Sequence, residues 1–145
     1  MKVTLLITLL LWCWNLNAQL NPFYSTENDQ YGFKDATGKV IVKPQFDFAW
    51  NFSEGMAPVK LNGKYGYVND KGIIVVPPTF AYARMFSDGL AVVKVGTKYG
   101  FIDKTGRIVV PAIYDRADNF HGDRANVSLN KKWSVMIYTF KKETK

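Results

Sequence analysis

Cysteine and histidine are almost absent from this 145-residue chain, which contains one of each. Cys13 lies in an apolar N-terminal segment, and removal of that segment would leave no thiol to form disulfides or thiolate zinc sites. A lipid anchor on Cys13 is disfavoured because bulky Trp12 precedes it, where such an anchor needs a small residue. With His121 as the only histidine, a cluster of histidine metal ligands is excluded, and any His-based catalytic site would have to be built on that residue.

Other patterns that carry chemistry are missing too. No glycine-rich loop follows a strand and opens a helix, so nothing supports a nucleotide site. Asp35, Asn69 and Asp103 recur singly at the starts of turns, where Asx-turn hydrogen bonding explains them; a calcium site would need about six to eight oxygens gathered together. His121 falls in a turn and is interpreted as solvated. We expect no catalytic residues, no metal and no cofactor.

Long apolar runs are confined to the start of the chain. Lys2 is followed by an apolar run over residues 3–11, and small and polar residues follow up to Ala18. The apolar stretch reaches only about Trp14, whereas a membrane-spanning helix needs about 20 apolar residues. We therefore expect residues 1–18 to be a cleaved signal peptide, with no stable membrane span afterwards. Export through the inner membrane would place the protein in the periplasm, on the cell surface or outside the cell.

Acidic residues are outnumbered: there are 12 Asp and Glu against 19 Lys and Arg, and loss of Lys2 with the signal peptide would leave a net charge of +6. Such a charge favours anionic partners such as membrane surfaces, acidic polysaccharides or nucleic acid, although it also aids solubility. An exported protein meets nucleic acid rarely, so we expect no nucleic-acid partner. Residues 19–145 are enough for one domain with a sizeable core.

Internal repetition is what the chain has in abundance. Three gapless copies of 34 residues occupy 31–64, 65–98 and 99–132, and a partial fourth copy is expected over 133–140, before a charged tail at 141–145. The copies open with Tyr31-Gly32-Phe33, Tyr65-Gly66-Tyr67 and Tyr99-Gly100-Phe101, and a glycine follows seven residues after each opening tyrosine, at Gly38, Gly72 and Gly106.

Each copy is expected to contain about four short antiparallel strands. The opening strand alternates, and a turn rich in Asp, Asn and Gly follows it. A β-branched run then predicts a strand that is apolar on both faces and that ends at proline: Val40–Val42 before Pro44, Ile73–Val76 before Pro77 and Pro78, and Ile108–Val110 before Pro111. After an irregular middle segment and a second turn, the last strand alternates between a core face and a wet face.

Asn62-Gly63 joins the last strand of one copy to the first strand of the next, and Asn-Gly between alternating strands is a strong hairpin signal. The folding unit is therefore expected to straddle the sequence repeat, from about Met56 to Val76. In the N-terminal segment, residues 19–30, a partial capping strand at Ser25–Glu27 should pair with Tyr31–Lys34.

The fold class is all-β. Three copies plus fragments cannot close a propeller, which needs at least four blades. The copies predict tandem antiparallel hairpin repeats in an open, twisted, solenoid-like array in which each copy covers the last. A compact barrel-like closure of the same hairpins is the alternative.

The unit resembles the WG-containing repeat of bacterial proteins, with its aromatic-glycine pair, D-x-x-G turn, apolar strand with proline and F-S-E-G-L-A-x-V segment. The matching stretches are Tyr65-Gly66-Tyr67, Asp103 to Pro111 and Phe86 to Lys94, and the resemblance covers residues 31 to about 138. The departures are tyrosine for tryptophan in the full copies, Ser134 for glycine in the fourth, and loss of Ser-Glu-Gly in the third, which suggests a cap. The resemblance implies exported or envelope-associated binding scaffolds rather than enzymes.

Aromatic residues that recur at matched positions are expected in the core, at Phe46, Phe52, Phe80, Phe86 and Phe120. Positions where the copies swap aromatic for charge are expected at the surface, where Trp, Tyr and Arg commonly dominate contacts. The predicted binding residues are Phe48, Trp50, Tyr82, Arg84 and Arg116.

The predicted function is a non-catalytic exported scaffold that binds a protein or an envelope polymer through its repeat surface. The alternative is a small secreted hydrolase acting on envelope material, for which two carboxylates should face each other in a cleft.

We predict that Gly63→Val destabilises the protein by more than the ~0.5 kcal/mol of a typical surface substitution, because a β-branched residue resists the positive φ of an Asn-Gly hairpin. Urea unfolding of parent and variant measures the difference. Equal stability would contradict the hairpin and its register.

Overall fold

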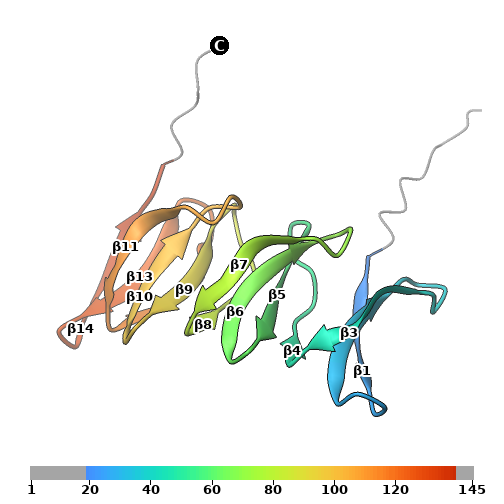
Figure 1. Cartoon of the computed structure of the whole chain (residues 1–145). Helices are drawn as coiled ribbons and strands as arrows, with labels where there is room; N and C mark the ends of the chain where they lie inside the picture. Colours follow the sequence, from blue (N-terminus) through green and yellow to red (C-terminus); the bar gives the residue numbers. More distant parts are fainter. Residues whose placement is uncertain (1–18, 140–145) are drawn as a thin grey trace, which may run out of the picture.

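The structure is a computed structural model that describes residues 19–139 (Figure 1). The predicted signal peptide and the charged tail lie outside the described residues. Within that range the chain forms fourteen strands and no helix, and accordingly none that could cross a membrane.

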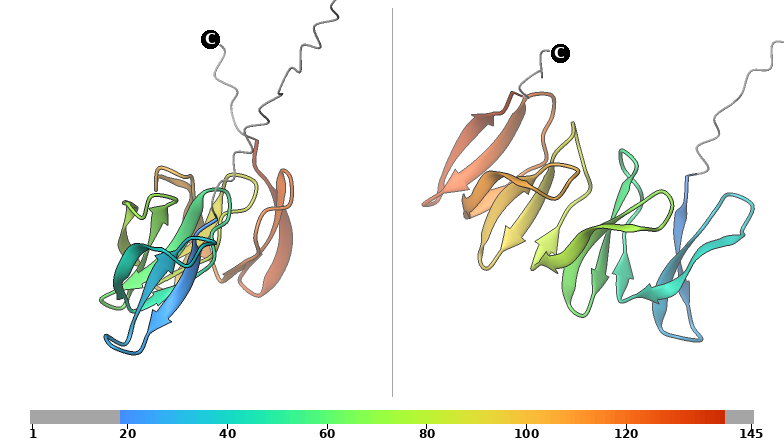
Figure 2. Two further views of the ribbon diagram at one scale, coloured as in Figure 1. Left: turned by 90° about the vertical axis from the view of Figure 1, so that its right-hand side faces the viewer. Right: turned by 45° about the horizontal axis from the view of Figure 1, so that its top comes forward.

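The strands form four antiparallel sheets, in each of which neighbours in space are consecutive in the chain. Their members are β1 (Asn21–Ser25), β2 (Gln30–Lys34) and β3 (Val40–Phe46); β4 (Phe48–Ala49), β5 (Met56–Leu61), β6 (Lys64–Asn69) and β7 (Ile74–Phe80); β8 (Tyr82–Ala83), β9 (Ala91–Val95), β10 (Lys98–Ile102) and β11 (Ile108–Tyr114); and β12 (Arg116–Ala117), β13 (Arg124–Leu129) and β14 (Lys132–Ile137). We number these sheets 1 to 4. They follow one another in an open row (Figure 2), so the open array is confirmed and the barrel-like alternative is not adopted by the described residues.

Each interior sheet combines strands from two sequence copies. The hairpin between β5 and β6 has Asn62 at φ 50° and Gly63 at φ 77°, and Leu61 pairs with Lys64 on either side of it. These left-handed values are those of a type I′ turn, which suits the twist of the strands. The prediction that the folding unit straddles the sequence repeat is confirmed.

The prediction that proline ends each β-branched strand is wrong. β3, β7 and β11 run through their prolines with a bulge: Phe33 pairs with Val42, yet Tyr31, two residues away, pairs with Phe46, four residues away. Proline is tolerated because each of these strands is the outer strand of its sheet, where its missing N–H breaks no ladder.

The glycine of each opening pair faces this bulge. A Cβ on Gly32 would lie 2.5 Å from the Val42 carbonyl oxygen, and one on Gly66 would lie 2.7 Å from the Pro78 nitrogen. No side chain fits where backbone approaches so closely. Ser134 takes the glycine position in β14, the outer strand of sheet 4, and no described strand lies beyond it.

The β-branched strands are apolar on both faces, as predicted, but they are buried on one face only. Val42 and Val76 are buried, whereas Val40, Ile41 and Ile74 are more than a third exposed. These outer strands turn only one side toward the core. The rest of their apolar surface is exposed along the sheet edges formed by β3, β7 and β11, opposite β4 and β8 in sheets 2 and 3.

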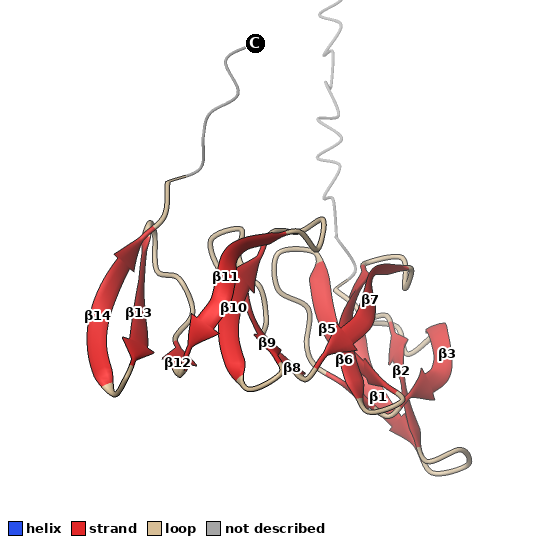
Figure 3. Ribbon diagram, turned by 60° about the vertical axis from the view of Figure 1, so that its left-hand side comes forward, coloured by secondary structure: helices blue, strands red, loops and turns tan. Residues whose placement is uncertain are grey.

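The predicted wet face of the last strand is wrong for β5 and β9, where Met56, Pro58 and Val92 are buried as well as Val59 and Val93. A neighbouring sheet covers each face of sheets 2 and 3. The predicted wet face is correct for β13, where Arg124 and Asn126 are exposed, because sheet 4 is the last sheet of the described row (Figure 3).

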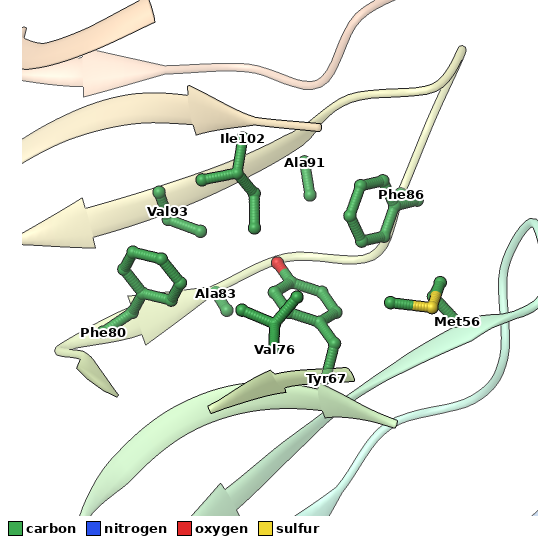
Figure 4. Close-up of a cluster of buried hydrophobic side chains, with 9 residues drawn as sticks. All are labelled: Met56, Tyr67, Val76, Phe80, Ala83, Phe86, Ala91, Val93 and Ile102. Carbon is green, nitrogen blue, oxygen red and sulfur yellow. The ribbon is translucent and has the colours of Figure 1, made fainter. Parts of the chain in front are cut away.

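The core consists of three apolar clusters, one between each pair of successive sheets. In the middle cluster, Tyr67 from sheet 2 packs against Phe86 with ring centroids 4.9 Å apart, and its hydroxyl donates to the Arg84 carbonyl at 2.7 Å (Figure 4). Burial raises the pKa of this phenol, which stays protonated as a donor. Four of the predicted core phenylalanines are buried members of these clusters, Phe46, Phe80, Phe86 and Phe120, and the fifth, Phe52, is partly buried and packs against the first cluster.

The second turns of the copies form a hydrogen-bonded ladder along the row. Ser53 donates its hydroxyl to the Phe86 carbonyl at 2.7 Å, and Glu54 accepts from the Gly89 N–H at 3.0 Å. Ser87 repeats the first bond to Phe120, and Asp88 accepts from Gly122. The third copy contributes only backbone groups to this ladder among the described residues: the Phe120 carbonyl accepts from Ser87 and the Gly122 N–H donates to Asp88, and neither bond needs a Ser-Glu-Gly sequence there.

The first turns are Asx turns, as predicted. Asp103 Oδ1 accepts from the backbone N–H of Thr105 at 3.0 Å and of Arg107 at 3.1 Å. Desolvation opposes ionisation here, but the hydrogen bonds prevail and lower the pKa of Asp103. The following Gly106 has φ 86°, and a Cβ added there would lie 3.0 Å from Val76 of the preceding copy, so this turn too lies against a neighbouring copy.

The N-terminal pairing strand is β1, at Asn21–Ser25, rather than Ser25–Glu27. Its partner β2 is as predicted, but Thr26 to Asp29 form the turn. Because the turn takes four residues, the strand lies closer to the N-terminus than predicted. Leu20, just before the strand, is buried in the first core cluster.

We predict that Gly66→Ala destabilises the protein by about 1 to 3 kcal/mol, because the new methyl group collides with the backbone of the β7 bulge. The matched control Ser134→Ala, at the same repeat position but exposed, should change stability by less than about 0.5 kcal/mol. Urea unfolding measures both. A tolerated methyl group at Gly66 would refute the tight approach.

Candidate functional site

One margin of sheets 2 to 4 is formed by the two-residue strands β4, β8 and β12, which carry three of the predicted binding residues. Residues directly opposite in adjacent strands lie on the same face of a sheet. Pairing across the strands therefore places one row of three side chains on each sheet: Phe48, Lys60 and Tyr65; Tyr82, Lys94 and Tyr99; and Arg116, Ser128 and Trp133.

Aromatic pairs fill the junctions between the first three sheets at this margin. Tyr31 of sheet 1 packs against Phe48 of sheet 2 with ring centroids 5.1 Å apart, and Phe48 in turn contacts Trp50 at 5.4 Å. At the next junction, Tyr65 packs against Tyr82 at 5.7 Å. In both copies the opening tyrosine meets an aromatic residue 17 positions later, carried by the next sheet.

The third junction is different, because Arg116 replaces the second aromatic residue. Arg116 is exposed, and a pocket of about 370 Å³ lies beside Tyr99. Trp133 is 56% exposed and lines both this pocket and an adjacent hollow of about 510 Å³. The charged and aromatic lining residues of the pocket are Arg84, Lys94, Tyr99, Asp115, Arg116, Asp118 and Trp133.

A smaller hollow of about 180 Å³ is lined by Trp50, Tyr82 and Arg84. Arg84 lines both this hollow and the 370 Å³ pocket, so the two adjoin. We call the continuous surface the aromatic–cation groove and define it by Trp50, Tyr82, Arg84, Tyr99, Arg116 and Trp133.

The acidic residues of the groove already have cationic partners. Lys98 donates to Asp115, and this bond lowers the pKa of the Asp115 carboxyl. Arg84 lies 3.9 Å from Asp118.

Two cations face the groove without a carboxylate partner among the described residues. The Lys94 ammonium lies over the Tyr99 ring, 5.3 Å from its centroid. Arg116 forms no ion pair within residues 19–139. The groove therefore offers positive charge beside aromatic rings.

The structure brings four of the five predicted binding residues to the groove: Trp50, Tyr82, Arg84 and Arg116 line its hollows. Phe48 is half-buried between Tyr31 and Trp50 and supports the groove instead of lining it.

Sequence reasoning did not identify Lys94, Tyr99 and Trp133 as part of this surface. The only signal for them was their register opposite the middle segment, which becomes visible once the strands are paired.

The two carboxylates of the 370 Å³ pocket lie beside cations. Asp115 and Asp118 line the same pocket, but each is engaged by a cation. A general acid needs a raised pKa, and the ammonium of Lys98 has the opposite effect on Asp115. His121 is exposed in the third-copy turn, whose backbone pairs with Arg124.

Comparison with known proteins identifies a family. The family model described as "WG containing repeat" matches residues 31–65, 65–99 and 99–133, in register with the three copies. No curated protein and no solved structure matches the chain.

We predict that Arg116→Tyr stabilises the protein by about 0.5 to 1.5 kcal/mol, because the new ring can pack against Tyr99 as Tyr82 packs against Tyr65. Arg124→Tyr, at an exposed site outside the groove, should give no such gain. Urea unfolding compares the two variants. Equal effects would show that the third junction does not accept an aromatic pair.

Proposed function

The chain belongs to the WG containing repeat family, and on that premise we propose that it is a non-catalytic scaffold that binds a protein or a polymer of the cell envelope. The observation that carries the proposal is the aromatic–cation groove. Aromatic and arginine side chains, which dominate binding hot spots, gather along one margin of a repeat array.

The repeat array suits binding because its interior is committed to packing. The clusters between sheets bury the repeated aromatic residues, so variation between copies is tolerated at the margin. Residues that differ between copies, such as Tyr82 and Arg116, can then define a ligand site without weakening the core. Solenoid arrays commonly bind partners across the surfaces of several repeats.

The proposed location is the periplasm, the cell surface or the exterior, reached by way of the signal peptide expected at residues 1–18. The proposal of a non-catalytic role is supported by the cations beside Asp115 and Asp118 and by the position of His121, which is exposed in a turn and does not line the groove.

The test is capture of partners from envelope extracts by the purified protein. We predict that changing Trp50, Arg84 and Arg116 together to alanine abolishes capture while the melting temperature stays close to that of the parent, because these side chains lie at the margin and not in the core clusters.

The matched control changes Ile41, Lys39 and Lys71 to alanine. It likewise removes one exposed large apolar residue and two cations, from outside the groove. This variant should capture partners as the parent does. Capture that survives loss of Trp50, Arg84 and Arg116 would remove the proposed function.

A further inference from the structure

We propose that the groove binds an acidic polysaccharide, a chain of uronic acid sugars, with its specific contacts at the third junction. Trp133 would stack on a sugar ring while Arg116 and Lys94 bind carboxylates. The inference rests on the proposed function and names the chemical class of its ligand.

Charge complementarity favours an anionic ligand. The three adjoining hollows are lined by four cationic residues, Arg84, Lys94, Arg116 and Lys131, against the two acids Asp115 and Asp118. Both acids are already engaged by cations, whereas Arg116 is exposed and unpaired among the described residues. Its guanidinium can bind a carboxylate in a bidentate manner.

The aromatic surfaces favour a sugar. Trp133 is 56% exposed and Trp50 is 39% exposed, so both offer open rings rather than closed apolar pockets. The C–H face of a pyranose can stack on such a ring, while its hydroxyls reach polar side chains at the rim. Thr97, Asp118 and Asn130 line the same hollows and can exchange hydrogen bonds with hydroxyls.

The repetition of the array favours a polymer. Sheets packed face to face lie about 10 Å apart, which is close to the length of a disaccharide in an extended 1,4-linked chain. Sheets 2 to 4 each carry an aromatic residue at the same place in the cross-strand row, at Tyr65, Tyr99 and Trp133, and Tyr65 is half-buried against Tyr82. A chain laid along the row could therefore pass an aromatic residue of each of these sheets at regular intervals, with the most exposed of them, Trp133, on sheet 4.

An acidic peptide fits this margin less well. Extended peptides gain affinity by pairing with a long free strand, but β4, β8 and β12 contain two residues each and belong to separate sheets. A sugar chain needs no backbone partner, since its contacts are made by side chains alone.

The test uses polygalacturonate as the probe and its methyl ester as the uncharged counterpart of the same chain. Binding to the purified protein is followed by tryptophan fluorescence and by affinity electrophoresis at low and high salt. We expect the protein to bind polygalacturonate at least about tenfold more tightly than the ester, the difference that corresponds to about 1.4 kcal/mol. Added salt should weaken binding to the polyanion.

Variants locate the site. Arg116→Gln should weaken polygalacturonate binding about tenfold, as expected for loss of one charge-assisted contact. Trp133→Ala should weaken it by a similar factor, and Arg116→Tyr should close the pocket and have the same effect. The control Lys132→Gln removes one positive charge next to Trp133 in sequence but outside the lining of the groove, and should bind as the parent does.

Four results would overturn the inference: no binding of polygalacturonate, equal binding of the ester, binding that ignores Arg116 and Trp133, or tighter binding of polyglutamate or single-stranded DNA. The capture experiment separates this inference from the proposed function. If capture depends on Trp50, Arg84 and Arg116 while polygalacturonate does not bind, the scaffold function stands and the polysaccharide inference falls.

Discussion

Burial of each sheet against its neighbours is the constraint on which the rest of the structure depends. Sheets 2 and 3, of four short strands each, have two apolar faces and no core of their own, so they are stable only when covered on both sides. β5 and β9 are buried on both faces for this reason. The hairpin at Asn62 and Gly63 strengthens the coupling, because it joins two sequence copies within one sheet.

The repeated motifs act as links between strands and between copies. The glycine after each opening tyrosine has no side chain, so the backbone of the proline-containing bulge in the next strand can pack directly against it. The glycine and proline motifs therefore form one backbone contact. Ser53 and Glu54 reach forward to the next copy, as Ser87 and Asp88 do. Two departures fall where the described residues do not require these links: within residues 19–139 no bulged strand pairs with Ser134, and no turn follows the third-copy turn in the row.

The margin of the array follows different rules from its interior. The inner positions require particular sizes, as Tyr67 and Phe86 show by filling the middle cluster, whereas a residue at the margin has solvent on one side. The change from Tyr82 to Arg116 is therefore compatible with the same backbone, and it replaces an aromatic contact with a charged pocket. A surface with distinct chemistry can arise in this way on an otherwise periodic scaffold.

The sequence by itself determined the local structure and its repetition. The 34-residue period, the Asn62-Gly63 hairpin, the Asx turns and the core phenylalanines depend on short-range backbone chemistry and on periodic burial, both of which are visible in one dimension. The middle-segment positions Trp50, Arg84 and Arg116 could be predicted as surface because a core position would not alternate between aromatic and charged residues.

Only the tertiary structure decided which faces are covered and which side chains meet. Whether Val40 or Pro58 is buried depends on whether a neighbouring sheet, formed by a distant segment, covers it. A strand can continue through proline only because it is the outermost strand of its sheet. Lys94, Tyr99 and Trp133 join the groove through strand register and through the junction between sheets 3 and 4. Local sequence does not encode these relations separately, because they arise when sheets built from two copies pack against one another.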